Sequence, residues 1–558
     1  MQSFLFLLEM MRLERTDGNI WQRDRSPGTG CFRLCFPVLI LVPFAPTRGE
    51  EGVEDIKERR ARRYKPRLDP VVYNPPMQND TIAAIGTPSG YGGIGVIRVS
   101  GPEAFEQVLP LLQRPDKRTD LPQSHLLIYG HIVDPTTREM LDEVLVAFMH
   151  APHTYTREDV VEIQGHGGPL VLQRILRLVL TQGARMANPG EFTLRAFLNG
   201  RLDLAQAEAV MDLISAQTEA GQRLAVQQLR GRVSEQIQDA RHTVLGVIAR
   251  IEASIDFPEE DVPTPQPEEL QPLIGMAQQK VATLLTGAEQ GRLYRQGLRT
   301  VIIGRPNVGK SSLLNALLRA DRAIVTPVAG TTRDTVEEVA NLQGIPLHLI
   351  DTAGITPSID PVEQIGIQRS RAAAESADVI LLVFDGSEQL AEQDLLVSEE
   401  LQTMGFGGDL GMHHEQANGD ISTRRNKAMI IVVNKADCPQ QLETARLERL
   451  WSGVPIIRTS MLTGEGLSNL EQAIADLVLA GRTLYSESAL VTSARHQEAL
   501  RHAAENLRAA SVSLQQQLPL DFVSIDLRAA YDALGEVTGE TASDDLLDRI
   551  FSEFCIGK

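Results

Sequence analysis

A glycine-rich segment in the second half of the chain constrains the fold more than any other feature. Residues Gly304 to Ser311 read Gly-Arg-Pro-Asn-Val-Gly-Lys-Ser, which matches the pattern G-x-x-x-x-G-K-[ST]. The segment follows a strand-like run and precedes a helical pattern, so its backbone N–H groups and the helix N-terminus can surround phosphates. We expect Lys310 to reach the β- and γ-phosphates and Ser311 to bind Mg²⁺.

Three further motifs follow in the order expected of a guanine-nucleotide domain. Thr331 and Thr332, in Gly-Thr-Thr-Arg-Asp, can close over Mg²⁺, and Asp351-Thr-Ala-Gly brings a carboxylate near the metal. Asp437, in Asn-Lys-Ala-Asp, can accept from the guanine N–H and amino groups together, which adenine cannot match. The predicted nucleotide contacts are Asn307, Val308, Gly309, Lys310, Ser311, Ser312, Thr326, Pro327, Val328, Ala329, Gly330, Thr331, Thr332, Asp351, Thr352, Ala353, Gly354, Asn434, Lys435, Ala436, Asp437, Ser460 and Met461.

The residue that orients water during hydrolysis is not obvious from these motifs. Many Ras-like enzymes place a glutamine directly after Asp-Thr-Ala-Gly, but Ile355 stands there in this chain. Asp360 and Glu363 follow in the same loop. Either of them takes over the role, or both are ordinary solvated carboxylates.

The pattern of apolar residues divides the chain into several domains. Strand-like runs alternate with helical segments over 297–482, which predicts a Ras-like domain with a mostly parallel, doubly wound sheet. Helical periodicity dominates on both sides, at 196–296 and 483–558, so we expect one helical domain into which the nucleotide domain is inserted. Residues 79–195 mix short strands and helices in an α+β pattern, and residues 404–426 resemble a surface loop insertion.

Residues 1–78 form a charged, proline-rich lead that is predicted to be disordered or to result from a mis-called start. Its apolar run, near 35–45, is shorter than the ~20 residues needed to span a bilayer and contains two prolines, so no membrane association is expected. An organelle-targeting segment is the less favoured alternative. Four scattered cysteines indicate a reducing, cytoplasmic compartment rather than a disulfide framework.

The net charge of −19 argues against a protein that coats nucleic acid through excess Lys and Arg. Any RNA contact must therefore use a local basic patch or a partner protein.

Two glycine clusters mark the 79–195 segment. Gly90 to Gly95 matches G-x-G-x-x-G, but a strand rather than a helix follows, so we reject a dinucleotide site. Arg98 then lies mid-strand, either on a solvated face or paired with an anion. The second cluster, Gln164 to Pro169, surrounds His166; it predicts either a tight turn with a structural histidine, which we favour, or a close ligand approach. Glu162, just before it, can pair with a cation.

Several longer segments resemble the MnmE (TrmE) family of tRNA-modifying GTPases, from about residue 80 to the C-terminus. Those segments are Thr81–Ile85, Gly92–Gly101, Gln164–Pro169, Arg195–Ala209, Asp256–Asp261, Gly330–Asp334, Val362–Ile367 and the terminal Phe554-Cys-Ile-Gly-Lys558.

The resemblance implies an N-terminal domain that binds a formyl or methylene derivative of tetrahydrofolate and forms a homodimer. It also implies an FAD-dependent MnmG-like partner in a heterotetramer. Together the two proteins would add an aminomethyl or carboxymethylaminomethyl group to C5 of the tRNA wobble uridine. By motif matching, Arg98, Glu162, Arg201 and Lys558 contact the folate, and Cys555, the family's conspicuous thiol, is a candidate catalytic residue.

For the nucleotide domain, the resemblance implies a bound K⁺ in place of an arginine finger, with Asn307, Thr326, Val328 and Thr331 at its ligand positions. It also assigns the water-activating role to Glu363. The chain departs from the family at Arg157, where glycine is usual, and at Arg201, where lysine is usual.

A different class of function shares the nucleotide motifs. Regulatory switch GTPases of the Era or EngA kind, which act in ribosome assembly, would also carry the Gly-Thr-Thr-Arg-Asp loop. They lack the folate-type N-terminal domain and the Cys-Ile-Gly-Lys ending, so we keep this function as the alternative.

Overall fold

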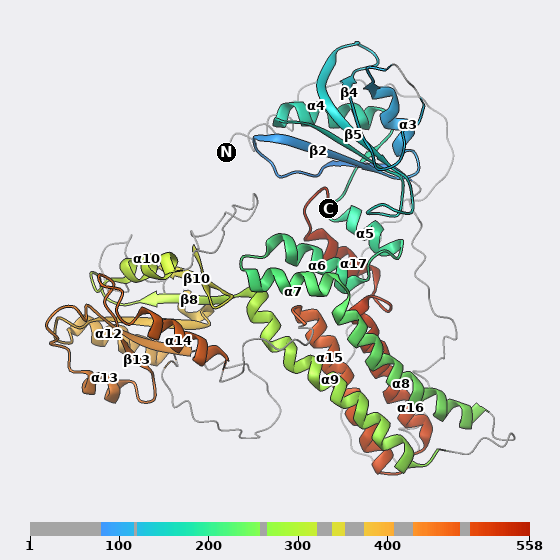
Figure 1. Cartoon of the computed structure of the whole chain (residues 1–558). Coiled ribbons are helices and arrows are strands. Elements are labelled where there is room, and N and C mark those ends of the chain that lie inside the picture. The colour runs from blue at the N-terminus through green and yellow to red at the C-terminus, as the bar shows by residue number, and fades with distance from the viewer. Residues whose placement is uncertain are drawn as a thin grey trace, which may run out of the picture. The chain divides into compact units, whose positions relative to one another are not determined.

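The computed structural model describes residues 80–116, 120–256, 265–320, 338–351, 373–404, 406, 428–479 and 491–558. The lead segment 1–78 and nearly all of the 404–426 insertion lie outside these residues. Figure 1 shows two sheet-containing regions and a set of long helices. No helix in the described part of the chain is long and apolar enough to cross a membrane.

The N-terminal region is built on a seven-stranded sheet in the order β3-β4-β5-β6-β2-β1-β7. Its strands are antiparallel except for the β1–β7 pair. Along β2 the side chains alternate between a buried face, with Ile97 and Val99, and an open face, with Val96 and Arg98. Helix α4 (Pro169–Thr181) packs its apolar side on the buried face. The strands are β1 Ile82–Ile85, β2 Gly92–Ser100, β3 Leu112–Gln113, β4 Leu127–Val133, β5 Met140–Met149, β6 Val160–Gly167 and β7 Arg185–Met186.

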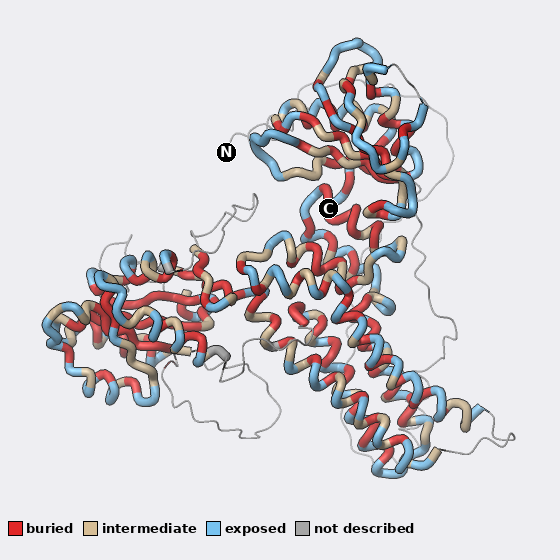
Figure 2. The backbone as a smooth tube through the Cα atoms, in the orientation of Figure 1, coloured by how far each residue is buried: buried red, intermediate tan, exposed pale blue. Residues whose placement is uncertain are grey.

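Four long helices from both ends of the chain share one core. Helices α8 and α9 precede the nucleotide sheet in the sequence, and α15 and α16 follow it. Their apolar residues recur at helical spacing and form one buried core. Figure 2 shows buried segments recurring along each of these helices. The shorter helices α5, α6, α7 and α17 make up the rest. The bounds are α5 Glu191–Leu198, α6 Leu204–Ser215, α7 Glu219–Leu229, α8 Arg232–Asp256, α9 Pro267–Gln296, α15 Ala494–Gln515, α16 Leu520–Thr538 and α17 Asp544–Ser552.

The nucleotide region contains a six-stranded sheet in the order β13-β12-β11-β8-β10-β9. All neighbouring strands are parallel except β9, which pairs antiparallel with β10. The strands β11 and β12 are buried on both faces, because separate apolar cores lie on the two sides of the sheet. This is a mostly parallel, doubly wound arrangement. The elements are β8 Leu298–Ile303, α10 Lys310–Ala320, β9 Glu338–Leu342, β10 Ile345–Asp351, β11 Val379–Asp385, α12 Glu392–Thr403, β12 Ala428–Asn434, α13 Thr444–Leu450, β13 Ile456–Arg458 and α14 Leu467–Leu479.

Candidate functional site

The glycine-rich loop joins β8 to α10 at the carboxyl edge of the parallel sheet, where α/β domains bind ligands. Gly304 passes so close to β11 that a Cβ atom there would lie 2.5 Å from the carbonyl oxygen of Val383. Gly309 has φ +102°, and a side chain would collide with the amide of Asn434. Asn307 also adopts a left-handed conformation, with φ +67°. The glycines are therefore required by close backbone packing as well as by phosphate access.

The side chain of Lys310 lies folded back over this loop. The residue is buried, and its Nζ donates to the carbonyl oxygens of Gly304 and Arg305, each at 3.0 Å. Ser311 and Ser312 follow in the first turn of α10, with exposed side chains. The ammonium group is thus already positioned inside the loop, where an incoming phosphate would replace the two carbonyl oxygens as its acceptor.

The predicted base-recognition residues converge from two loops. Asn434, at the end of β12, is buried; its Nδ2 donates to Val308 O at 2.9 Å, and its Oδ1 accepts from Met461 N at 3.3 Å. Asp437 is exposed, and its Oδ1 accepts from the Ser460 hydroxyl at 2.5 Å. That hydrogen bond is the main reason why the pKa of Asp437 lies below its ordinary value. The exposed carboxylate is therefore ionised, as an acceptor for guanine requires.

Many predicted nucleotide contacts lie outside the described residues. These are Thr326, Pro327, Val328, Ala329, Gly330, Thr331, Thr332, Thr352, Ala353, Gly354 and the candidate water-orienting residues Asp360 and Glu363. Asp351 is the last residue of β10, at the same sheet edge as the glycine-rich loop.

In the N-terminal region, Arg98 and Glu162 face each other across β2 and β6. Arg98 donates to the Oε1 atom of Glu162 from Nε at 2.9 Å and from Nη2 at 2.7 Å. Both side chains are about one-fifth exposed. Of the two alternatives for Arg98, pairing with an anion is confirmed.

Sequence reasoning missed Tyr155, which connects two of the predicted folate contacts. Its ring lies 5.6 Å from the Arg98 guanidinium carbon and 4.7 Å from that of Arg201, within the range of cation–π contacts. Arg201 also donates to the Tyr155 carbonyl oxygen at 3.0 Å, and the Tyr155 hydroxyl bonds the Thr193 hydroxyl at 2.9 Å. No local pattern indicates this role, because its partners are distant in the sequence.

The last residues of the chain contact the same Arg98 side chain. Arg98 Nη1 donates to Gly557 O at 3.3 Å, and Phe192 N donates to Lys558 O at 3.2 Å. Lys558 is half-buried; burial, and next the charge of Arg98, hold its pKa below the ordinary value. Cys555 is exposed and reduced. Arg98 therefore contacts Glu162, Tyr155 and the C-terminal tail that carries Lys558, and Arg201 contacts the same Tyr155 ring.

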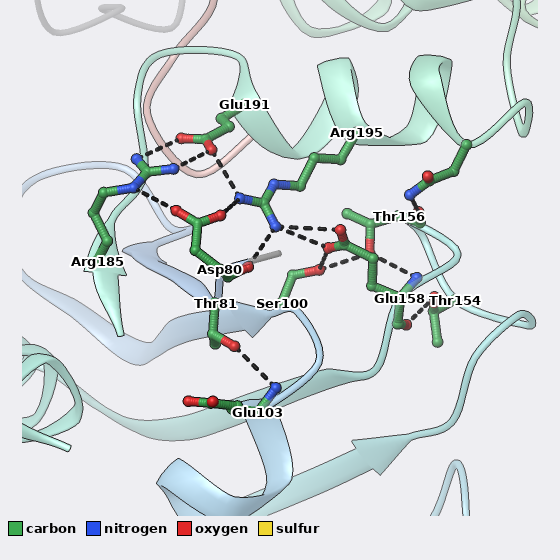
Figure 3. Close-up of polar contacts among 11 residues, drawn as sticks. Asp80, Thr81, Ser100, Glu103, Thr154, Thr156, Glu158, Arg185, Glu191 and Arg195 are labelled. Atoms are coloured by element: carbon green, nitrogen blue, oxygen red, sulfur yellow. Dashed lines mark hydrogen bonds and ion pairs between the residues drawn. The ribbon is translucent and has the colours of Figure 1, made fainter. Parts of the chain in front are cut away.

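A partly buried ion network centred on Arg195 holds Glu158 and its neighbours Thr154 and Thr156 (Figure 3). Arg195 of α5 contacts Asp80 at 2.6 Å, Glu191 at 3.0 Å and Glu158 at 3.2 Å. Arg185 adds further bonds to Asp80 and Glu191. Because Glu158 is only three residues from Tyr155, the network holds the loop against both α5 and the start of β1.

The prediction of a turn at His166 is wrong. Residues 160–167 form β6, and the glycines permit close approach: a Cβ atom on Gly165 would lie 2.5 Å from Asp142 Oδ2. His166 is exposed, and its Nδ1 lies 2.6 Å from Asp142 Oδ1; this hydrogen bond is the main cause of its raised pKa. A cavity of about 400 Å³ opens beside it on the face that carries Glu162, lined by Gly93, Ile94, Tyr129, Glu143, Val144, Leu145, Gln164, Gly165 and His166.

Comparison with known proteins decides the family. The family model described as MnmE helical domain matches residues 204–555, and the one described as GTP-binding protein TrmE N-terminus matches residues 81–201. A relative from Natranaerobius thermophilus, named tRNA modification GTPase MnmE, is 46% identical over 483 residues, which cover 86% of this chain and 100% of the relative. The chain belongs to the MnmE family. A second MnmE relative, from Exiguobacterium sibiricum, is 45% identical with the same coverage.

Among solved structures, Era from Aquifex aeolicus bound to GDP·AlF₄⁻ is 26% identical to this chain. The match covers 37% of this chain and 65% of the Era chain, with a TM-score of 0.25. The G domain of the FeoB iron transporter from T. maritima is 28% identical. Its match covers 32% of this chain and 96% of that domain, with a TM-score of 0.23.

Arg157, where the sequence resemblance leads us to expect glycine, has an unusual backbone conformation. Arg157 has φ +60°, a left-handed conformation that glycine adopts more easily than arginine. Its Nη1 donates to Asn199 O at 2.8 Å, which ties the Tyr155 loop to the end of α5. The arginine thus adopts a strained backbone but adds a contact between this loop and α5.

Proposed function

We propose that this chain is a K⁺-dependent GTPase of tRNA modification. It hydrolyses GTP to GDP and phosphate and, with an FAD-dependent MnmG-like partner, adds an aminomethyl or carboxymethylaminomethyl group to C5 of the tRNA wobble uridine. The observation that carries the proposal is that one chain combines a guanine-type nucleotide loop with a C-terminal tail seated on the Arg98–Glu162 pair. Relatives named tRNA modification GTPase MnmE match it over their whole length.

In the nucleotide domain, the predicted residues divide the steps of hydrolysis among them. Lys310 binds the β- and γ-phosphates, and Asp437 reads the guanine edge. Water attacks the γ-phosphorus, the bond to the β–γ bridging oxygen breaks, and Glu363 accepts the proton from the water. Ser311 and Thr332 would hold Mg²⁺, and Asn307, Thr326, Val328 and Thr331 would hold K⁺. Both ions supply positive charge to the phosphates when bound.

The left-handed conformation of Asn307 fits a residue that turns toward a ligand at the loop tip, and the hydroxyl of Ser311 suits Mg²⁺, which prefers oxygen ligands.

The folate assignment is supported by the charge balance of the N-terminal site. Arg98 pairs with Glu162, Arg201 lies on the neighbouring Tyr155 ring, and Lys558 adds a third cationic side chain, so these three cationic side chains outnumber the Glu162 carboxylate and the α-carboxylate of Lys558. Such an excess of positive charge suits an anionic ligand. A tetrahydrofolate derivative carries carboxylates on its glutamate tail and a flat ring that can enter the cavity beside Gln164. When bound, it would supply the one-carbon unit, and Cys555 is an exposed free thiol in the C-terminal tail.

The proposed function also implies partner molecules, beginning with a second copy of this chain. Four large apolar side chains lie exposed on the open face of the N-terminal sheet: Ile94, Leu127, Tyr129 and Leu145. Contiguous apolar surface of this kind marks interaction sites, which supports a homodimer through this domain. We further propose a heterotetramer with the MnmG-like protein, tRNA as substrate and a cytoplasmic location.

The first test is GTP turnover by the purified full chain in KCl and in NaCl, with Glu363→Ala in parallel. The proposal predicts strong stimulation by K⁺ that is lost in the variant. Equal, slow turnover in both salts would contradict the K⁺ and Glu363 assignments and favour the Era- or EngA-like switch.

A further inference from the structure

One buried carboxylate beside the nucleotide loops has no role in the function proposed above. Asp385 ends β11 and is only 5% exposed. Its Oδ1 accepts from the backbone N and the hydroxyl of Ser387, at 2.9 and 2.6 Å. Its Oδ2 lies 2.5 Å from Nζ of Lys435. A buried charge is retained only where partners compensate for lost hydration, and here three donors do so.

The arrangement of Lys435 is the reverse of the usual one. Lysine normally buries its aliphatic stem and leaves the ammonium in water. Here the ammonium is held at a carboxylate whose side chain is 3% exposed, while the Lys435 side chain as a whole is 37% exposed. Lys435 also has φ +65°, so its backbone is held in a conformation that non-glycine residues rarely adopt.

Gly386, directly after β11, contacts the loop that carries Lys435 and Asp437. Gly386 N donates to Asn434 O at 2.9 Å, and Gly386 is buried so closely that a side chain would collide with Gln440. Gln440 in turn donates from Nε2 to Lys435 O at 2.9 Å. The loop that carries Asp437 is thus fixed on both sides of Lys435.

We propose that Asp385 is a positioning residue for guanine recognition. By holding the Lys435 ammonium, it keeps the aliphatic stem of Lys435 extended as an apolar wall beside the base whose edge Asp437 reads. A flat purine covers such a stem well, because burial of apolar surface is favourable and needs no directional bond. The inference rests on the proposed binding of guanine nucleotides and adds the residue that shapes the base site.

The test is the affinity of the full chain for a fluorescent GDP analogue, together with KM and kcat for GTP. Four variants are compared: Asp385→Asn, Lys435→Met, the double variant, and Glu392→Gln as a control. Asp385→Asn should raise the Kd roughly 10- to 100-fold, the loss expected for a hydrogen bond between charged groups. KM should rise accordingly, while kcat at saturating GTP stays within about twofold.

The double variant separates positioning from simple damage. Asp385 acts through Lys435. The double variant should therefore bind the GDP analogue no more weakly than whichever single variant has the lower affinity. Additive losses, or wild-type affinity in Asp385→Asn, would overturn the proposal. If Asp385→Asn does not fold, Ser387→Ala removes a hydrogen bond from the same carboxylate; unchanged GDP affinity in that variant would also overturn it. Glu392, on the surface of α12, should have no effect.

Failure of the underlying function would look different. If the wild-type chain itself neither binds the GDP analogue nor hydrolyses GTP, the proposed function is wrong. Asp385 would then have no role in guanine recognition either.

Discussion

The carbonyl oxygen of Gly557 accepts a hydrogen bond from Nη1 of Arg98, although the two residues are 459 positions apart. Gly557 has φ +93°, and a Cβ atom there would lie 2.5 Å from Ile85 O. The last residues of the chain are therefore fitted against the first strand of the N-terminal sheet, and they complete the cluster of Arg98, Glu162 and Lys558.

Replacing Gly557 by alanine should displace this tail. The left-handed backbone and the collision with β1 both oppose a side chain, so Lys558 would leave the site. We expect the affinity for 5-formyltetrahydrofolate, measured by calorimetry, to fall at least about tenfold, a loss of roughly 1.4 kcal/mol. GTP turnover should be unchanged. Ile556→Ala, at an exposed neighbouring residue, is the matched control; equal losses in both variants would contradict this account.

The nucleotide site and the N-terminal site differ in how much of their structure can be predicted from short sequence motifs. The glycine-rich loop, Lys310 and Asp437 belong to short motifs whose geometry is local, so their place at the carboxyl edge of the sheet can be predicted from sequence. His166 was assigned wrongly because glycine also occurs in strands where another chain segment approaches closely. Tyr155 and the pairing of Arg98 with Glu162 depend on register and on contacts between distant segments, which one sequence does not reveal.

Tyr155 should contribute to folate affinity through its ring. Tyr155→Phe keeps the contacts with Arg98 and Arg201 and loses only the hydroxyl bond to Thr193, so its affinity for 5-formyltetrahydrofolate should stay within about threefold of wild type. Tyr155→Leu removes both cation–π contacts and should weaken binding by roughly 1–2 kcal/mol. The same titration measures both variants, and an equal effect of Phe and Leu would refute the role of the ring.

Arg157 offers a test of backbone strain. Glycine at this position relieves the left-handed conformation, whereas alanine keeps the strain and also loses the bond to Asn199. We expect Arg157→Gly to be about 1 kcal/mol more stable than Arg157→Ala in denaturant unfolding. Indistinguishable midpoints and slopes for the two variants would show that the loop relaxes without cost.

Low pH should destabilise the helical region, because it protonates the buried carboxylate of Glu208. Burial alone would raise the pKa of this carboxyl, but His496 and Arg495 outweigh it, so the folded pKa lies far below the ordinary 4.5. A depressed carboxyl pKa stabilises the fold above the unfolded value, and this contribution is lost as the pH falls below about 4.5.

Glu208→Gln should consequently lower the melting temperature at pH 7, because one partner of a buried ion cluster is lost, a cost of about 3–5 kcal/mol. The difference from wild type should shrink between pH 5 and pH 3, since wild type loses its advantage there. The melting temperatures of both proteins across this range provide the measurement. A difference that is constant with pH would mean that Glu208 is not the titrating group.

The most direct test of the central claim measures wobble uridine in cellular tRNA. Cells whose only copy of the gene encodes the full chain, Lys310→Ala, or the chain without residues 555–558 are compared by nucleoside analysis of their tRNA. We predict that the modified uridine is present with the full chain and lost with both variants. Persistence of the modified uridine in both variants would contradict the account, because neither GTP hydrolysis nor the C-terminal site would then be needed for the reaction.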